Sequence, residues 1–576
     1  MAENPKHRVV FLSSRANIAA GRNAAGARLA RFAGRTIAGV LLLLPLLALT
    51  CLISGDALGA DRPNILFILA DDMGFADAGC YGGEIATPNL DRLAANGVRF
   101  TQFYNTARCW PTRAALLTGY YPQQIRMDPP HGKLPEWTRL LPHYLKPLGY
   151  RSYHSGKWHV NGAPLAITNG GFDRSYRLED HDRNFYPSNH WVDDVRQAPV
   201  PKGSNYYTTV AFADFMIGCL KEHAEKFSGQ PFFGYLAFTA PHFPLQAPPE
   251  DIARYRDKYL AGWDVIRQQR YQRQLKMGLV NCALSEREPE TVPYWNLKDT
   301  ELKEQISPGE VARAMAWSEL NDEERRFQAT KMAIHAAMID RMDREIGRVL
   351  DQLKAMRALE NTIVMFASDN GTSAEFLNRG DKHDPSAAPG SGGSFLCLGP
   401  GWSTVGNTPF RLHKSWVHEG GISTPLIVHW PKGIAARGEL RSTPGHVIDF
   451  VPTMLELVGA KPEPKWNGVE APPWPSRSLV SAFGKDVSVP RDFLYFHHEN
   501  NRALRIGDWK LVSKRPNTND YALYDLSRDR AEQINMAGRE PERVAAMARR
   551  WQEIESDFRK LAGPLPPPRT ARQGAE

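Results

Sequence analysis

The sequence predicts an α/β protein: a mainly parallel sheet flanked by helices, followed by a small C-terminal α+β domain with an antiparallel sheet. Two observations predict this fold. Continuous apolar runs alternate with segments of helical periodicity, which favours parallel strands that are buried on both faces. Beyond residue 461 the apolar runs become short and closely spaced, as in antiparallel strands. A composition of 42% apolar and 23% charged residues is typical of globular proteins and excludes a disordered chain or a multi-span membrane protein.

Residues 1–60 have the pattern of an export signal. Arginines are frequent up to residue 36, an apolar run covers residues 37–53, and small residues follow at 57–60. The alternative is an uncleaved membrane segment, for which the run is short, because a spanning helix needs about 20 apolar residues. We therefore expect an exported protein that is periplasmic or secreted, or anchored to a membrane if the segment is uncleaved.

The net charge of +8 does not indicate a nucleic-acid partner. One Lys and six Arg against two acids give residues 1–60 a charge of +5, which leaves +3 for the rest of the chain. A basic face for nucleic acid is therefore not expected. Six cysteines in 576 residues are also too few for a disulfide scaffold. The sequence indicates no pairing for Cys80, Cys219, Cys282 and Cys397.

Residues 61–460 are expected to form the first domain. Its continuous apolar runs predict strands at residues 64–70, 150–155, 231–238, 363–367 and 425–428. Helical periodicity occurs between them at residues 89–96, 207–225 and 323–356. The segment 253–322 is rich in Arg, Gln and Glu, which indicates a helical insertion on the surface.

A proline-rich stretch from 460 to 475 separates this part from a domain at 461–562. Short strands are expected there at residues 493–497, 503–506, 510–513 and 522–524, and a helix at 541–562. The tail 563–576 is expected to be disordered.

Four of the expected strands are followed by polar side chains. Asp71-Asp72, Gly156-Lys157-Trp158-His159, Pro241-His242 and Ser368-Asp369-Asn370-Gly371 each stand at the carboxyl end of a strand. Because open α/β sheets bind ligands at that edge, these residues mark a candidate site. The hard oxygen ligands of Asp71, Asp72, Asp369 and Asn370 suit Ca²⁺ or Mg²⁺ rather than Zn²⁺. An isolated Asp-Asp pair is also typical of a turn or a helix cap.

The segment Cys109-Trp110-Pro111-Thr112-Arg113 is the most specific feature of the sequence. Pro111 suits the first turn of a helix. Cys109 would then lie at the positive end of the helix, where an anion is favoured, and Arg113 would lie on the same face. A half-buried cysteine at an ordinary helix start is the alternative reading. A cysteine-dependent phosphatase is excluded, because the usual longer Cys-to-Arg loop is missing.

The chain resembles the formylglycine-dependent sulfatases of the alkaline-phosphatase-like superfamily, and among them the bacterial arylsulfatase-like group. Residues 109–113 match the core pattern Cys-x-Pro-Ser/Thr-Arg, and residues 149–159 match the second signature. Trp110 departs from the pattern, since a small residue is more common there, and Arg108 is a second departure. The resemblance extends from about residue 64 to 536. Further matches are Pro241-His242, Asp369-Asn370-Gly371, Lys414 and His418-Glu419-Gly420-Gly421.

The resemblance implies that a formylglycine-generating or other sulfatase-maturing enzyme oxidises Cys109 to formylglycine. The hydrated aldehyde has two hydroxyls: one attacks sulfur, and the other lets the sulfated intermediate collapse and expel sulfate. It also implies the role of each remaining residue. Asp71, Asp72, Asp369, Asn370 and residue 109 would hold the metal, Arg113 would stabilise the diol, Lys157 and Lys414 would bind sulfate oxygens, His242 would be the general acid, and His159 would accept the diol proton.

The function that the sequence predicts is hydrolysis of sulfate monoesters, either aryl sulfates or sulfated carbohydrates. With the metal, Arg113, Lys157 and Lys414 set against three carboxylates, the site has a charge of about +2, which attracts phosphate esters as well. A phosphonate monoester or phosphodiester hydrolase with the same aldehyde is therefore one alternative. A non-catalytic protein that binds sulfated glycans is the other.

Overall fold

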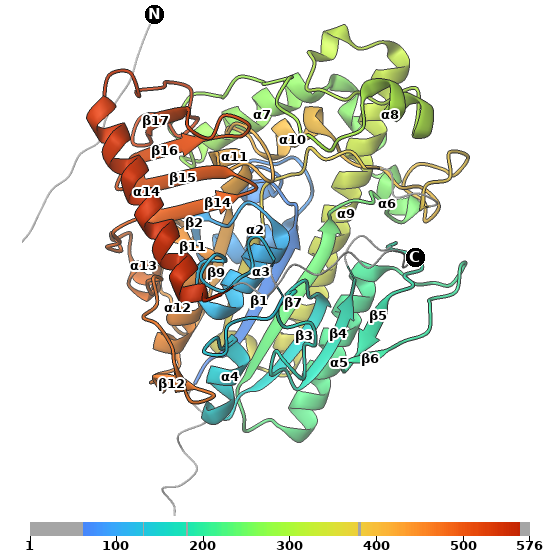
Figure 1. The fold of residues 1–576 in the computed structure, drawn as a ribbon. Coiled ribbons are helices and arrows are strands. Elements are labelled where there is room, and N and C mark those ends of the chain that lie inside the picture. Colours follow the sequence, from blue (N-terminus) through green and yellow to red (C-terminus); the bar gives the residue numbers. More distant parts are fainter. Residues whose placement is uncertain (1–61, 131, 180–182, 378–381, 565–576) are drawn as a thin grey trace, which may run out of the picture. The chain divides into compact units, whose positions relative to one another are not determined.

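The computed structural model describes residues 62–130, 132–179, 183–377 and 382–564. Its centre is a sheet in the order β10-β2-β9-β8-β1-β7-β3-β4-β5-β6, with β11 also paired to β2 (Figure 1). The strands are β1 (Asn64–Asp71), β2 (Val98–Tyr104), β3 (Arg151–Lys157), β4 (Arg174–Leu178), β5 (His190–Val192), β6 (Val195–Arg196), β7 (Phe232–Pro241), β8 (Thr362–Ser368), β9 (Ser423–His429), β10 (Glu439–Arg441) and β11 (Gly445–His446).

The middle of this sheet is parallel, which confirms the predicted fold class. β1 pairs in parallel with β7 and β8, and β3 pairs in parallel with β7 and β4. The sheet becomes mixed toward both edges, because β9 runs antiparallel to β8 and β2, and β5 runs antiparallel to β4. The carboxyl ends of β8, β1, β7 and β3 therefore lie at one edge of four neighbouring strands.

Helices cover both faces of the sheet, as the continuous apolar run of β1 requires. Ile65, Phe67 and Leu69 pack into a core with helices α3, α4 and α12. Leu66 and Ile68 point to the opposite face and pack with α2, α5 and α9. The helices are α2 (Pro88–Ala95), α3 (Cys109–Thr118), α4 (Leu141–Leu145), α5 (Thr208–Lys226), α6 (Pro249–Ala253), α7 (Trp263–Lys276), α8 (Asp299–Gln305), α9 (Asp322–Ala355), α10 (Pro400–Gly406), α11 (Glu419–Ile422), α12 (Phe450–Leu457), α13 (Val480–Gly484) and α14 (Pro541–Ala562).

The C-terminal part contains a second, antiparallel sheet, again as predicted. Its strands follow one another in the order β14-β15-β16-β17, and α14 lies across them (Figure 1). A two-stranded hairpin, β12-β13, precedes this sheet. These strands are β12 (Lys465–Trp466), β13 (Val469–Glu470), β14 (Leu494–His498), β15 (Asn501–Ile506), β16 (Trp509–Ser513) and β17 (Tyr521–Asp525).

A buried ionic network joins the second sheet to the first. Lys510 of β16 lies 2.9 Å from Glu419 and 2.8 Å from Glu532, and all three side chains are inaccessible to solvent. Glu419 also accepts hydrogen bonds from Tyr104 of β2 and from Arg530. Burial works against ionisation, but Lys510 and Arg530 lower the pKa of Glu419 to about 2. The network thus fixes the C-terminal sheet to α11 and β2.

We expect Lys510→Met to destabilise the protein by about 3–5 kcal/mol, because it leaves two buried carboxylates without their shared cation. Denaturant unfolding measures the change. Lys514→Met is the matched control, since Lys514 forms a more exposed pair with Glu288 and its loss should cost less than about 1 kcal/mol.

The same network predicts a pH dependence of stability. In the wild type, the pKa of Glu419 lies below its value in the unfolded chain. Its contribution is therefore present above pH 4.5 and is lost as the pH falls toward 2. Equal stability of Lys510→Met and Lys514→Met would contradict the role of Lys510 in the network.

The predicted signal or membrane segment at 1–60 lies outside the described residues, as does the predicted tail from 565 onward. Within the described ranges, no helix is both long enough and apolar enough to cross a membrane. Cys80, Cys109, Cys219, Cys282 and Cys397 are all buried, and no disulfide joins any of them to another described residue.

Candidate active site

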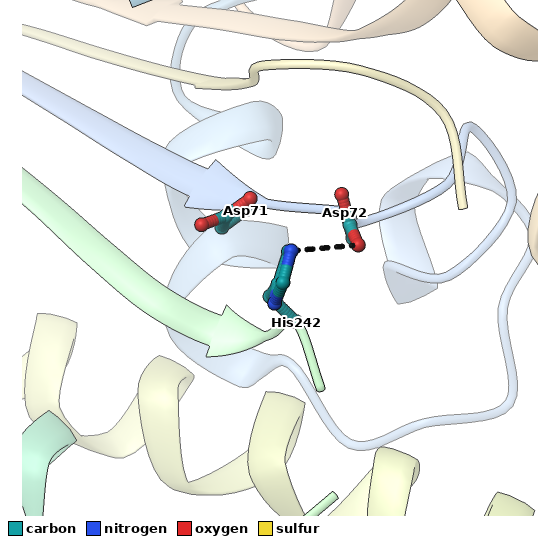
Figure 2. A group of neighbouring side chains, drawn as sticks. All are labelled: Asp71, Asp72 and His242. Atoms are coloured by element: carbon teal, nitrogen blue, oxygen red, sulfur yellow. Dashed lines mark ion pairs between the residues drawn. The ribbon is translucent and has the colours of Figure 1, made fainter. Parts of the chain in front are cut away.

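The ends of the four central strands bring together the side chains that the sequence predicts to act together. Asp71 is the last residue of β1, Lys157 is the last of β3, and His242 directly follows β7. Figure 2 shows the His242 ring directed toward the Asp72 carboxylate, with Asp71 beside it at the end of β1. The distance between His242 Nε2 and Asp72 Oδ2 is 3.6 Å. Asp369 follows β8, and its Oδ1 accepts a hydrogen bond from the Asp72 amide.

Helix α3 presents Cys109 and Arg113 to this edge. The helix begins at Cys109, which is 2% exposed, and ends at Gly119 in the left-handed conformation. The hydroxyl of Thr112 accepts a hydrogen bond from the Thr106 amide, which holds the loop before the helix. Arg113 lies one turn beyond Cys109 and is fully buried. Cys109 therefore lies at the positive end of a helix dipole, as the sequence predicts.

Three buried cations contact the carboxylates. Arg113 donates two hydrogen bonds to Asp369 Oδ2, of 3.0 and 2.8 Å, and lies 3.4 Å from Asp71 Oδ2. Lys157 Nζ lies 2.7 Å from Asp71 Oδ2. Lys414 Nζ lies 2.8 Å from Asp72 Oδ1. Although burial disfavours the charged form of Lys414, Asp72 and neighbouring acids hold its pKa above the usual range.

The buried carboxylates of the site lie close together, and their charged forms are disfavoured. Burial raises the pKa of Asp72 to about 6, with a further increase from Asp71 and a decrease from Lys414. Burial and the charge of Asp71 also raise the pKa of Asp369 well above its usual value. A divalent cation between these groups would offset both effects.

The donor set fits a divalent metal ion. Single ligand atoms of Asp71, Asp72 and His242 all lie within 4.8 Å of one another. Asn370 Nδ2 donates to Asp72 Oδ1, which places its amide beside the same carboxylates. Asn370 Oδ1 is buried and has no hydrogen-bond partner among the described residues, so it is available to a metal. Oxygen ligands of this kind suit Ca²⁺ or Mg²⁺.

Four residues at this edge of the sheet have a strained backbone. Asp72, Ala107, His159 and Ser415 all adopt positive φ angles, of 66°, 66°, 47° and 77°. Such conformations cost free energy in residues other than glycine, and they persist where the surrounding structure fixes a side chain for function. Gly371 meets a different constraint: a Cβ there would lie 1.9 Å from the Gly420 carbonyl oxygen, so no side chain fits.

His159 and Lys414 reach the site from segments outside the regular elements. His159 follows β3, and its ring lies 5.9 Å from the ring of Trp110. Lys414 lies between α10 and α11. Of the matched residues after it, Glu419 belongs to the ionic network with Lys510, whereas the carbonyls of Gly420 and Gly421 lie against Gly371.

The structure adds two charged residues, Glu375 and Arg108, to those that the sequence predicts for the site. Glu375 is buried between two cations, 3.2 Å from Lys414 Nζ and 2.8 Å from Arg108. Ser373 also donates a hydrogen bond to it. Both residues lie outside the helices and strands, so the sequence pattern does not predict their place in the site.

Known sulfatases are similar to this chain over most of its length. The sulfatase family model matches residues 63–460, and the model of the C-terminal part of N-sulphoglucosamine sulphohydrolase matches residues 410–557. An uncharacterised sulfatase of Schizosaccharomyces pombe is 32% identical over 87% of this chain and 95% of its own length. An arylsulfatase of Klebsiella aerogenes is 31% identical over 72% of this chain and 91% of its own. A solved structure in complex with its substrate, D-glucosamine-2-N,6-O-disulfate, has a TM-score of 0.59 at 21% identity, covering 87% of this chain and 98% of its own.

Proposed function

Because this chain belongs to the sulfatase family, whose members hydrolyse sulfate esters, we propose that it cleaves sulfate monoesters with a formylglycine made from Cys109. The position of Cys109 supports the proposal most strongly. It lies at the start of α3, one helical turn before a buried arginine that contacts Asp369 and Asp71. Both hydroxyls of the hydrated aldehyde would be carried by the Cβ atom of residue 109.

The residues around Cys109 have the charges and positions that such a reaction needs. Asp71, Asp72, Asp369 and Asn370 would hold the metal, with residue 109 as a further ligand. The metal, Ca²⁺ or Mg²⁺, would polarise a sulfate oxygen and favour the ionised nucleophile. Arg113 would stabilise the diol.

Four further residues would act on the sulfate ester itself. Lys157 and Lys414 are buried beside the acids and would bind the sulfate oxygens in the transition state. His242 would give a proton to the leaving alcohol, and His159 would accept the diol proton when the sulfated intermediate collapses. The substrate would be a sulfated small molecule or a sulfated carbohydrate.

Turnover of three substrate classes tests this assignment. The matured enzyme should hydrolyse 4-nitrophenyl sulfate with a higher kcat/KM than the corresponding phenyl phosphonate and phosphodiester. A preference for either phosphorus ester would favour the alternative hydrolase. Binding of sulfated glycans with no release of sulfate from any ester would instead favour the non-catalytic protein.

We expect His242→Ala to slow hydrolysis of alkyl sulfates by about 10²-fold or more, but hydrolysis of 4-nitrophenyl sulfate far less. A poor leaving group needs a proton as the bond breaks, whereas nitrophenolate leaves without one. Comparing kcat for the two esters measures the difference. His429→Ala is a control, because His429 is a buried histidine at the end of β9. An equal loss with both esters in His242→Ala would contradict the general-acid role.

We also propose that the protein is exported and periplasmic or secreted, with membrane attachment if residues 1–60 are retained. The basic, apolar and small-residue regions of that segment support this proposal. Its maturation would need a formylglycine-generating or other sulfatase-maturing enzyme as a partner.

A further inference from the structure

We propose that six residues beside Cys109 bind a hydroxyl-bearing sugar ring in the leaving group of the substrate. These residues, called the rim cluster below, are Arg108, Trp110, Tyr294, Trp295, Glu499 and Arg515. The proposal rests on the proposed function, because it concerns the part of a sulfate ester that departs when sulfate is removed. It adds a binding site for the sugar to the residues that act on the sulfate.

The rim cluster is a stack of alternating guanidinium groups and aromatic rings. The Arg108 guanidinium carbon lies 5.3 Å from the ring centre of Trp110 and 5.4 Å from that of Trp295. The Arg515 guanidinium carbon lies 5.3 Å from the Trp295 ring centre and 4.0 Å from the Tyr294 ring centre. The stack therefore begins at both chain neighbours of Cys109 and leads away from them.

Exposure increases along this stack. Cys109 is 2% exposed, the side chains of Arg108 and Arg515 are 11% and 20% exposed, and Tyr294 is 75% exposed. An exposed tyrosine of this kind has no role in the core. The gradient is the one expected for side chains that line the approach from solvent to a buried reacting group.

Three distant parts of the chain are fixed in place to form the cluster. The Asn296 side chain donates to the Ala374 carbonyl and accepts from the Phe376 amide, which holds Tyr294 and Trp295 against the segment that carries Glu375. Glu375 in turn binds Arg108 at 2.8 Å.

The C-terminal sheet supplies Glu499 and Arg515. Glu499 lies in the turn between β14 and β15. Asn501, two residues later, donates a hydrogen bond to the Ser415 carbonyl. His498, the residue before Glu499, packs edge-on against Trp110 with 5.4 Å between ring centres. Contacts between distant segments of the folded chain therefore hold the residues of the rim cluster in place.

The charges of the cluster favour a neutral ligand with hydroxyl groups. Each guanidinium is already paired with a carboxylate, Arg108 with Glu375 and Arg515 with Glu499 at 3.2 Å. The excess positive charge that a second sulfate would need is therefore missing here. Paired acids and guanidinium groups offer acceptors and donors side by side, and a sugar hydroxyl both donates and accepts.

Hydrogen-bonding capacity at the inner end of the cluster is unfilled. Trp110 Nε1 and Arg108 Nε are buried donors without a hydrogen-bond partner among the described residues. A phenyl ring would satisfy none of these atoms. A sugar has hydroxyls for them and apolar ring faces that pack on aromatic side chains.

Trp295→Ala tests the proposal through a ratio of two activities. We expect kcat/KM for O-sulfated disaccharides to fall about tenfold, the effect of losing about 1.4 kcal/mol of binding energy. We expect kcat/KM for 4-nitrophenyl sulfate to stay within about twofold of the wild type, since the sulfate site is unchanged. Trp295→Phe should recover most of the disaccharide activity, because it restores an aromatic face. Trp466→Ala is the matched control. Trp466 lies in the β12-β13 hairpin, outside the rim cluster, and its ring is also covered by an arginine, Arg139.

The outcomes separate this proposal from the proposed function. Loss of both activities by the same factor, or an unchanged ratio, would overturn the sugar site while leaving the sulfatase assignment intact. If the wild type hydrolyses the aryl sulfate but none of the disaccharides, the sugar site is likewise overturned and the sulfatase assignment stays intact. If the wild type hydrolyses no sulfate ester, the proposed function fails. Calorimetric binding of the same disaccharides to wild type and Trp295→Ala then decides the sugar site separately, with equal affinities overturning it.

Discussion

Replacing Cys109 by alanine should abolish turnover of every sulfate ester and leave the fold intact. The substitution removes the thiol on which the maturing oxidation would act, so no formylglycine can form at position 109 and the covalent route is lost. Loss of a nucleophile from an intact site commonly costs about 10⁴-fold or more in kcat. Alanine suits the start of α3 sterically, because it is smaller than cysteine and the other contacts of Thr112 and Arg113 remain.

Release of 4-nitrophenol and a thermal unfolding curve together measure this result. Cys397→Ala is the matched control, since Cys397 is equally buried but lies outside the candidate site. It should retain full activity with a comparable change in Tm. If Cys109→Ala retained more than a small fraction of the wild-type activity, the nucleophile would have to be another group. If it unfolded while Cys397→Ala did not, the cysteine would be structural.

Removing the metal should produce the second-largest loss, of about 10²-fold or more, because the metal supplies several kcal/mol of charge stabilisation in such reactions. Burial raises the pKa of Asp72 to about 6, with a further increase from Asp71 and a decrease from Lys414. A divalent cation beside Asp72 would favour its charged form. Addition of Ca²⁺ or Mg²⁺ should restore activity and raise Tm.

Activity and Tm should be measured on protein whose metal content has been determined before and after chelation. Titration with each ion then shows which one restores turnover at the lower concentration. Full activity in protein verified to be free of metal would exclude the metal role of Asp71, Asp72, Asp369 and Asn370.

The buried strands were predictable because their sequences are continuous apolar runs with few alternative structures. The runs at 64–70 and 363–367 became β1 and β8, paired in parallel. β2 is not predicted, since Arg99, Thr101 and Gln102 interrupt its apolar residues and weaken the signal. The direction of β9 could not be read from its composition either, and only its pairing shows it to be antiparallel to β8.

The core of the site was also predictable, because strand ends in a parallel sheet meet at one edge. Asp71, Lys157, His242 and Asp369 follow from that rule. Glu375 and Trp295 do not, since both lie on irregular segments whose positions depend on contacts between residues far apart in sequence. The hydrogen bonds of Asn296 to Ala374 and Phe376 are such contacts. No local sequence pattern predicts these hydrogen bonds.

Mass spectrometry of one tryptic peptide tests the central claim most directly. Trypsin cuts after Arg108 and Arg113 and so releases residues 109–113. In protein produced together with a sulfatase-maturing enzyme, this peptide should carry the aldehyde of formylglycine in place of the Cys109 thiol. Finding only the unmodified thiol, while a control sulfatase from the same cells carries the aldehyde, would contradict the claim.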